Sequence, residues 1–312
     1  DFVTTKQLRN LRIEGGDVAF DIELGYPAKS QIAALRKSLI GAARSVAGVE
    51  NVSANLATKI VAHSVQRGVQ LLPKVKNIVA VASGKGGVGK STTAVNLALA
   101  LAAEGATVGI LDADIYGPSQ PMMMGIEGRP DSADGKTMEP MENYGVQVMS
   151  IGFLVEADNP MIWRGPMATQ ALEQLLRQTN WGELDYLIVD MPPGTGDIQL
   201  TLSQRVPLTG AVIVTTPQDI ALLDAKKGIK MFEKVGVPIL GVVENMAVHV
   251  CEKCGHVEHI FGADGGKTMA AEYNIDYLGA LPLNLSIRVQ ADSGRPSVVH
   301  DPDGEIAQLY KS

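Results

Sequence analysis

The residues best suited to chemistry lie in a glycine-rich loop, Gly84-Lys85-Gly86-Gly87-Val88-Gly89-Lys90-Ser91. The loop matches G-x-x-x-x-G-K-[ST] between an expected strand and an expected helix, and its glycines let backbone N–H groups point at phosphate oxygens. We expect Lys90 to reach the β- and γ-phosphates of ATP, Ser91 to ligate Mg²⁺, and Thr92 or Thr93 to reach the α-phosphate. The loop therefore predicts that the chain binds ATP with Mg²⁺ and hydrolyses it.

Three aspartates follow apolar stretches in the order that such an ATPase requires. Asp112 and Asp114 share one face of an extended chain because side chains alternate there. We expect Asp114 to position the attacking water and Asp112 to lie on the Mg²⁺ side, and the two roles are exchangeable. Asp190 has the Walker B form, and Gly194 after it offers an N–H to the γ-phosphate. Helix capping or a turn is the competing interpretation for each aspartate.

Two other polar residues are candidates for nucleotide contacts. Lys85, one residue into the loop, resembles the early lysine of the deviant Walker A ATPases, which reaches the partner chain's nucleotide across a dimer. A solvated surface lysine is the alternative. Asn245 ends an apolar run, where its amide can donate to and accept from an adenine edge, although a turn asparagine has the same appearance.

The chain has only two cysteines, in the motif Cys251-Glu252-Lys253-Cys254. A thioredoxin-like redox pair requires a helix start in a small βαβ domain, and this context does not fit. A zinc site in one chain would recruit His256 and His259, but it lacks the spacer of roughly 12 residues found in zinc fingers. Two chains related by a two-fold axis would supply the four thiolates of a [4Fe–4S] cluster. Purely structural cysteines are the remaining alternative.

Apolar runs alternating with helical stretches position these residues. We expect strands at 78–82, 107–112, 146–151, 186–190, 211–215, 239–244 and 276–280. Nearly continuous apolar strands predict a mostly parallel sheet flanked by helices, a P-loop α/β fold, over residues 77–312. Residues 1–72 predict a small α+β domain, because one segment alternates with period two and the next is helical. Residues 73–76 form the linker, and residues 121–143 read as a long loop whose methionines serve in packing.

Composition excludes some partners. The net charge is −7 and aromatic residues make up 4% of the chain, so we expect no nucleic acid as a partner. The apolar runs stay shorter than the roughly 18 residues that a membrane helix needs, so we expect no membrane contact. Two close thiols in an acidic chain without a signal peptide favour a reducing compartment, the cytoplasm.

Several motifs together resemble the Mrp/ApbC branch of deviant Walker A ATPases, the iron–sulfur cluster carrier proteins. They are GKGGVGKS, LDADIYGPS, WRGP from Trp163, the stretch from Trp181 to Asp197, TTPQ from Thr215, and ENM followed by CxxCG. The resemblance runs from about residue 77 to residue 299, and residues 1–72 look like the small domain often fused ahead of that ATPase. It implies a homodimer with slow ATPase activity that holds a labile [4Fe–4S] cluster between subunits and delivers it to apo-proteins.

Two other functions compete with this one. A positioning ATPase of the ParA/MinD kind would also use Lys85, but the segment 305–312 is too short and too weakly basic for a membrane-targeting helix. A zinc-stabilised adapter would use ATP only as a conformational ligand, and it would contain zinc and release no phosphate.

Overall fold

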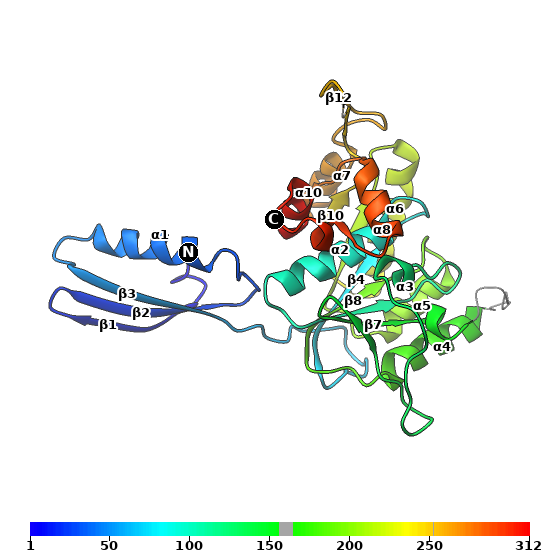
Figure 1. The fold of residues 1–312 in the computed structure, drawn as a ribbon, viewed down its shortest axis with the longest axis horizontal. Helices are drawn as coiled ribbons and strands as arrows, with labels where there is room; N and C mark the ends of the chain where they lie inside the picture. The colour runs from blue at the N-terminus through cyan, green and yellow to red at the C-terminus, as the bar shows by residue number, and fades with distance from the viewer. Residues whose placement is uncertain (156–164, 252) are drawn as a thin grey trace. The chain divides into compact units, whose positions relative to one another are not determined.

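The computed structural model describes residues 1–155, 165–251 and 253–312 (Figure 1). Trp163 of the WRGP motif and Glu252 between the cysteines lie outside the described residues. The chain divides into two compact units, one of residues 1–62 with 103–106 and one of residues 63–102 with 107–312. The domain boundaries at 72 and 77 stay a prediction.

The larger unit is built on an eight-stranded sheet with the order β13-β10-β9-β4-β8-β5-β7-β6. Its strands are β4 (Val75–Ala82), β5 (Val108–Asp112), β6 (Met141–Asn143), β7 (Val146–Ser150), β8 (Leu184–Asp190), β9 (Gly210–Thr215), β10 (Ile239–Glu244) and β13 (Tyr277–Ala280). Every neighbouring pair is parallel except β6 with β7. Strands β5 and β9 are buried along their whole length, which explains their continuous apolar sequence. The predicted mostly parallel sheet is confirmed.

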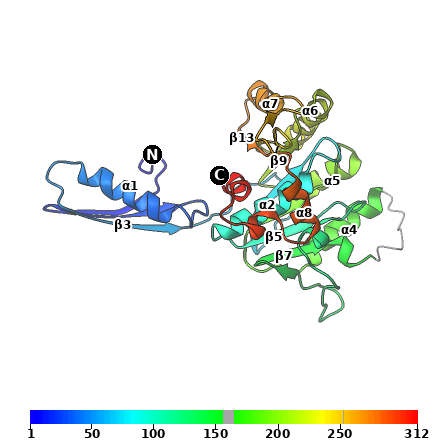
Figure 2. The ribbon, with the colours of Figure 1, turned by 45° about the horizontal axis from the view of Figure 1, so that its top comes forward.

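Helices flank this sheet (Figure 2). They are α2 (Lys90–Ala103), α3 (Gln120–Met123), α4 (Gly165–Gln178), α5 (Asp197–Arg205), α6 (Asp219–Lys234), α7 (Gly265–Tyr273), α8 (Leu285–Asp292), α9 (Ser297–His300) and α10 (Glu305–Lys311). The apolar run at 94–103 lies in α2, which is buried on several sides. Its buried Asn96 accepts from the backbone N–H of Val298 at 3.1 Å, so α2 is tied to the C-terminal segment. Among the described helices, none is long and apolar enough to cross a membrane.

The stretch 121–143 is a loop only in its middle. Its first residues belong to α3 and its last to β6, so the prediction of a continuous loop is wrong at both ends. Met124 is fully buried and Met122 is 64% exposed, so the expected packing role holds for Met124. Strand β6 is short and pairs antiparallel at the sheet edge, where a weak apolar signal is sufficient.

The smaller unit contains β1 (Leu8–Glu14), β2 (Asp17–Leu24), α1 (Ile32–Arg44) and β3 (Asn51–Thr58). Strand β2 pairs antiparallel with β1 and parallel with β3. Its core is centred on Phe20, Ile22 and Leu24, the alternating apolar residues of β2. The apolar side chains at helical spacing in α1 pack against this core, so the α+β prediction for this part of the chain is confirmed.

Candidate nucleotide site and cysteine loop

The strand order brings the predicted site residues to one edge of the sheet. Strand β4 ends at Ala82 and leads through the phosphate loop into α2. Strand β8 lies between β4 and β5, and Asp112 at the end of β5 is the register partner of Asp190 at the end of β8. In open parallel sheets ligands bind at the carboxyl ends of the strands. The loop and the aspartates therefore converge where a nucleotide is expected.

Glycines are required in the phosphate loop for two separate reasons. Gly87 and Gly89 have φ of 81° and 84°, in the left-handed region where a side chain is strained. A Cβ at Gly84 would overlap the backbone of Asp224 in α6, and one at Gly89 would overlap the amide of Asn245. The loop is thus shaped by its own conformation and by the close approach of α6 and of Asn245, which follows β10.

Lys90 is the centre of a charged cluster that also contains Asp114 and Asp190. Its ammonium lies 2.5 Å from Asp190 Oδ1, 3.1 Å from Ser91 Oγ and 4.0 Å from Asp114 Oδ2. The side chains of Lys90 and Asp190 are 6% and 0% exposed. Electrostatic interactions are strong at such depth because little water screens them. To reach β- and γ-phosphates, the Lys90 ammonium must exchange at least part of its contact with Asp190.

Gln120, which no sequence motif predicts as a site residue, is fully buried in the same cluster. Its side-chain Nε2 donates to Asp190 Oδ2 at 2.9 Å and to the backbone oxygen of Ser91 at 3.2 Å. The two oxygens of Asp190 are therefore held by different residues, Oδ1 by Lys90 and Oδ2 by Gln120. Gln120 is the first residue of α3 and directly precedes the stretch that we expected to be a loop. No residue spacing in the sequence identifies it as a site residue.

Asp112 accepts hydrogen bonds from four donors and is fully buried. The backbone N–H of Asp114 donates to Oδ1 at 3.2 Å. Oδ2 accepts from the backbone N–H groups of Ser119 and Gln120, each at 3.0 Å, and from Ser150 Oγ at 3.1 Å. The carboxylate thus caps the start of α3 and fixes the loop that carries Asp114. The capping interpretation applies to Asp112, while its role beside Mg²⁺ stays a prediction.

The two aspartates of the LDAD motif have raised pKa values. Burial, and next the neighbouring Asp190 carboxylate, raise the pKa of Asp112 to about 7. Burial also raises the pKa of Asp114, although the Lys90 ammonium opposes that shift. A carboxylate whose pKa is raised beside a phosphate site is a common feature of functional centres.

The raised pKa of Asp112 predicts a pH-dependent stability. The folded chain keeps the proton on the Asp112 carboxyl, while the unfolded chain releases it near pH 4. The contribution of this proton to the free energy of unfolding is therefore fully present below pH 4 and is lost as the pH rises through 7. Asp112→Asn removes the titration. As the pH rises from 5 to 7, the free energy of unfolding of the wild type should fall by roughly 2 kcal/mol relative to that of Asp112→Asn. Urea unfolding without nucleotide or Mg²⁺ measures it.

The matched control is Asp134→Asn at the surface. Backbone hydrogen bonds from Thr137 and Lys136 lower the pKa of Asp134, so its contribution is complete above pH 4 and should not change between pH 5 and pH 7. Asp112→Asn also loses a hydrogen-bond acceptor, which changes its free energy of unfolding by the same amount at every pH. The difference in slope between the two pH curves therefore reports the proton on Asp112. Parallel curves for wild type and Asp112→Asn would contradict the prediction.

The structure also places three other predicted residues. Asn245 Nδ2 donates to the backbone oxygen of Val88 in the phosphate loop at 2.8 Å, and the adenine contact stays a prediction. The N–H of Gly194 donates to the backbone oxygen of Ser83 at 3.0 Å, so this bond must open before that N–H can reach a γ-phosphate. Lys85 is half-buried, and within the described part of the chain its ammonium forms no ion pair.

The cysteines lie in the turn of a small hairpin formed by β11 (His249–Val250) and β12 (Val257–Glu258). The backbone of Cys251 is fixed at both ends: its N–H donates to His256 O at 2.9 Å and its oxygen accepts from Gly255 N–H at 2.8 Å. Cys251 is half-buried and Cys254 is exposed. Among the described residues no group of three or more His, Cys, Asp or Glu side chains could hold a metal ion. Within that part of one chain, the loop supplies two thiols.

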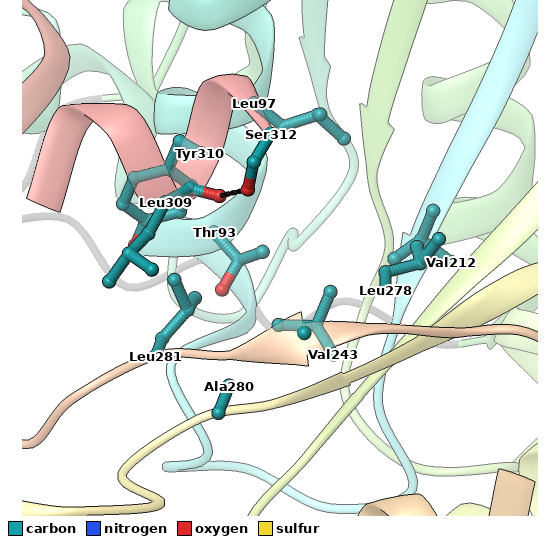
Figure 3. Close-up of a pocket in the computed structure, with 11 residues that line it drawn as sticks. Thr93, Leu97, Val212, Val243, Leu278, Ala280, Leu281, Leu309, Tyr310 and Ser312 are labelled. Carbon is teal, nitrogen blue, oxygen red and sulfur yellow. Dashed lines mark hydrogen bonds between the residues drawn. The ribbon is translucent and has the colours of Figure 1, made fainter.

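A separate cavity of ≈ 210 Å³ lies between α2, the end of β13 and α10 (Figure 3). Leu97, Val243 and Leu281 make its walls largely apolar. Its link to the phosphate loop is Thr93, whose Oγ donates to the backbone oxygen of Gly89 at 2.9 Å. Of the described residues, no lysine, arginine, aspartate or glutamate lines this cavity, in contrast to the charged cluster around Lys90.

Comparison with known proteins agrees with this geometry. The family model described as NUBPL iron-transfer P-loop NTPase matches residues 74–312, and the model of an iron–sulfur cluster assembly protein matches residues 1–55. An iron–sulfur cluster carrier protein of Pseudomonas fragi is 60% identical over 266 residues, which cover 85% of this chain and 93% of that protein. The carrier protein of Escherichia coli K12 is 63% identical over 238 residues, 76% of this chain and 64% of that protein.

Two solved structures extend the comparison. A nucleotide-binding protein from Archaeoglobus fulgidus in complex with ADP has a TM-score of 0.66 at 38% identity, covering 76% of this chain and 93% of that one. The cell division ATPase MinD of Pyrococcus furiosus has a TM-score of 0.56 at 21% identity, covering 75% and 95%, and shows the fold alone. The resemblance drawn from the motifs is confirmed: this chain belongs to the NUBPL/Mrp family of iron-transfer P-loop NTPases.

Proposed function

We propose that the chain is an ATP-hydrolysing carrier that assembles a labile [4Fe–4S] cluster between two copies of itself and transfers it to apo iron–sulfur proteins in the cytoplasm. One observation carries this proposal. Asn245 contacts the phosphate loop through Val88, and Cys251 follows it only six positions later. A movement of the phosphate loop can therefore be transmitted to the cysteine hairpin through Asn245 and the short stretch of backbone that follows it.

The residues at the phosphate loop fit Mg²⁺ and ATP. Mg²⁺ prefers oxygen ligands, and Ser91 and Asp190 offer a hydroxyl and a carboxylate beside the loop. A buried side-chain oxygen of Gln120 in this cluster has no hydrogen-bond partner among the described residues, which leaves one acceptor available to a polar guest. The metal would neutralise charge on the β- and γ-phosphates. Lys90 would bind the same phosphates, and Asp114 would orient the attacking water.

The cysteine loop fits a cluster better when two chains contribute. Two thiols per chain become four across a two-fold axis, which is the number a [4Fe–4S] cluster requires. The exposure of Cys254 gives a recipient protein access to the cluster, which is the cargo of the reaction. The Nδ1 of His259 lies 2.9 Å from the backbone oxygen of Ala247, which fixes the ring and leaves Nε2 as its one possible metal ligand, so the zinc alternative has to be tested directly.

The test is anaerobic reconstitution with iron and sulfide. We expect about four irons per dimer, since the four thiolates of two chains hold one [4Fe–4S] cluster. Cys251→Ser/Cys254→Ser should bind none, because these are the only cysteines in the chain. The control is His256→Gln/His259→Gln, which should keep the iron. The quantities to measure are iron content, visible absorbance and the mass of the dimer.

Other outcomes would reject the proposal. If iron binding survives without both thiols, the cluster does not lie at this loop. If the wild-type chain takes up zinc in place of iron and the histidine variant loses it, the loop is a zinc site of one chain. Transfer is tested separately by adding an apo-ferredoxin and following its activation.

A further inference from the structure

Gln120 has an orientation that its neighbours determine. Both groups within reach of its Nε2, the Asp190 carboxylate and the backbone oxygen of Ser91, only accept hydrogen bonds here. The amide nitrogen must therefore face them, because the opposite rotation would place Oε1 against two acceptor oxygens. The carbonyl oxygen of the amide consequently points away from Asp190.

That carbonyl oxygen, Oε1, is buried and has no hydrogen-bond partner in the part of the chain that the structure describes. The hydroxyl oxygen of the preceding residue, Ser119, is likewise buried and without a partner among those residues. Buried acceptors of this kind cost stability unless a donor reaches them, and these two belong to residues that bind Asp112 and Asp190, where a hydrated cation could supply that donor. The backbone of both residues donates to Asp112, which holds the two oxygens at the edge of the charged cluster.

Resting on the proposed function, we propose that Gln120 is a positioning residue for Mg²⁺. Its Nε2 keeps the Asp190 carboxylate oriented, and its Oε1 accepts a hydrogen bond from water bound to the metal. The arrangement is useful because Lys90 must turn from Asp190 towards the phosphates. Once Oδ1 of Asp190 is released, the bond from Gln120 to Oδ2 still fixes the carboxylate, and Oδ1 is available to the hydrated metal.

The experiment compares Gln120→Met with Gln199→Met. Methionine keeps the length of glutamine and removes both polar groups. Gln199 in α5 is the matched control because it is 2% exposed and, among the described residues, its two side-chain polar atoms have no hydrogen-bond partner and therefore do not bind the aspartates. Binding of a fluorescent ATP analogue is titrated with Mg²⁺. Outer groups around metal ligands typically change metal affinity 10–100-fold. We expect Gln120→Met to raise the half-saturating Mg²⁺ concentration by about 10-fold.

Binding of the analogue in EDTA separates the metal effect from damage to the loop. It should stay within about twofold of wild type in both variants, because the phosphate-binding backbone is unchanged. An unchanged Mg²⁺ dependence in Gln120→Met overturns the proposal. A similar loss of binding with and without Mg²⁺ also overturns it, since that result assigns Gln120 to the shape of the loop. If wild type binds no nucleotide in any condition, the proposed function itself fails.

A second measurement uses the unchanged chain and does not depend on a variant that folds. The side-chain N–H resonances of Gln120 are followed in ¹⁵N-labelled protein bound to the nucleotide. Addition of Mg²⁺ should shift these resonances and leave those of Gln199 in place. Gln120 resonances that do not move overturn the proposal.

Discussion

Replacing Lys85 with alanine is expected to lower ATP hydrolysis by about 10³-fold, the lower range seen for a cation supplied to a phosphoryl-transfer site by a partner. The free energy of unfolding should change by less than about 0.5 kcal/mol. The reason is that Lys85 is half-buried and forms no ion pair with the other described residues, so its replacement leaves none of their charges without a partner. Phosphate release and urea unfolding measure the two effects.

Lys74→Ala is the control for Lys85→Ala. Lys74 is exposed, lies outside the phosphate loop and has no ion pair within the described part of the chain, so its loss should change neither quantity. A destabilised Lys85→Ala with unchanged hydrolysis per folded molecule would contradict the prediction and make Lys85 a structural residue.

Mixing two inactive variants tests whether Lys85 acts on the partner's nucleotide. In a dimer of Lys85→Ala with Asp114→Asn, one site keeps Asp114 and receives Lys85 from the other chain. Random pairing then restores about a quarter of the wild-type rate, because half of the dimers are mixed and each has one complete site. No recovery would show that Lys85 acts within its own chain, or that the chains do not exchange.

The sequence predicts those parts of the site whose conformation depends on residues that are close together in the chain. The phosphate loop is recognised because its glycines must adopt positive φ or approach another backbone, as Gly87 and Gly84 do. Asp190 is recognised because it ends a buried apolar strand, and parallel strands end at one edge of the sheet. In both cases the cause lies within a few residues of the feature.

The parts that the sequence does not predict depend on contacts between distant residues. Gln120 binds Asp190, which lies 70 positions away, and no periodicity connects the two. Asp112 and Asp114 look equivalent along the strand, yet three backbone N–H groups and Ser150 converge on Asp112 alone because the chain turns back after Asp114. The cysteine hairpin is not predicted from the sequence, because each of its strands has only two residues.

Lys90→Met is expected to reduce stability as well as nucleotide binding, in contrast to Lys85→Ala. The Lys90 ammonium and the Asp190 carboxylate form a pair that is almost fully buried, and methionine leaves the carboxylate charge without its cation. Breaking such a pair by removing one partner costs about 3–5 kcal/mol. Urea unfolding without nucleotide or Mg²⁺ measures the loss. Lys76→Met provides the control, because Lys76 pairs with Asp185 at 2.7 Å but is 46% exposed, and its loss should cost at most about 1 kcal/mol.

The double variant Lys90→Met/Asp190→Asn isolates the pair. Once the carboxylate is neutral, the missing ammonium leaves no uncompensated charge, and the amide oxygen of asparagine still accepts from Gln120. The double variant should therefore be more stable than Lys90→Met, and the two substitutions should be coupled by about 2 kcal/mol or more. Additive effects would contradict a buried charge pair. Coupling would show that Lys90 is held by Asp190 as strongly as the geometry indicates, so that ATP would have to compete with a carboxylate for the lysine that we predict to bind its phosphates.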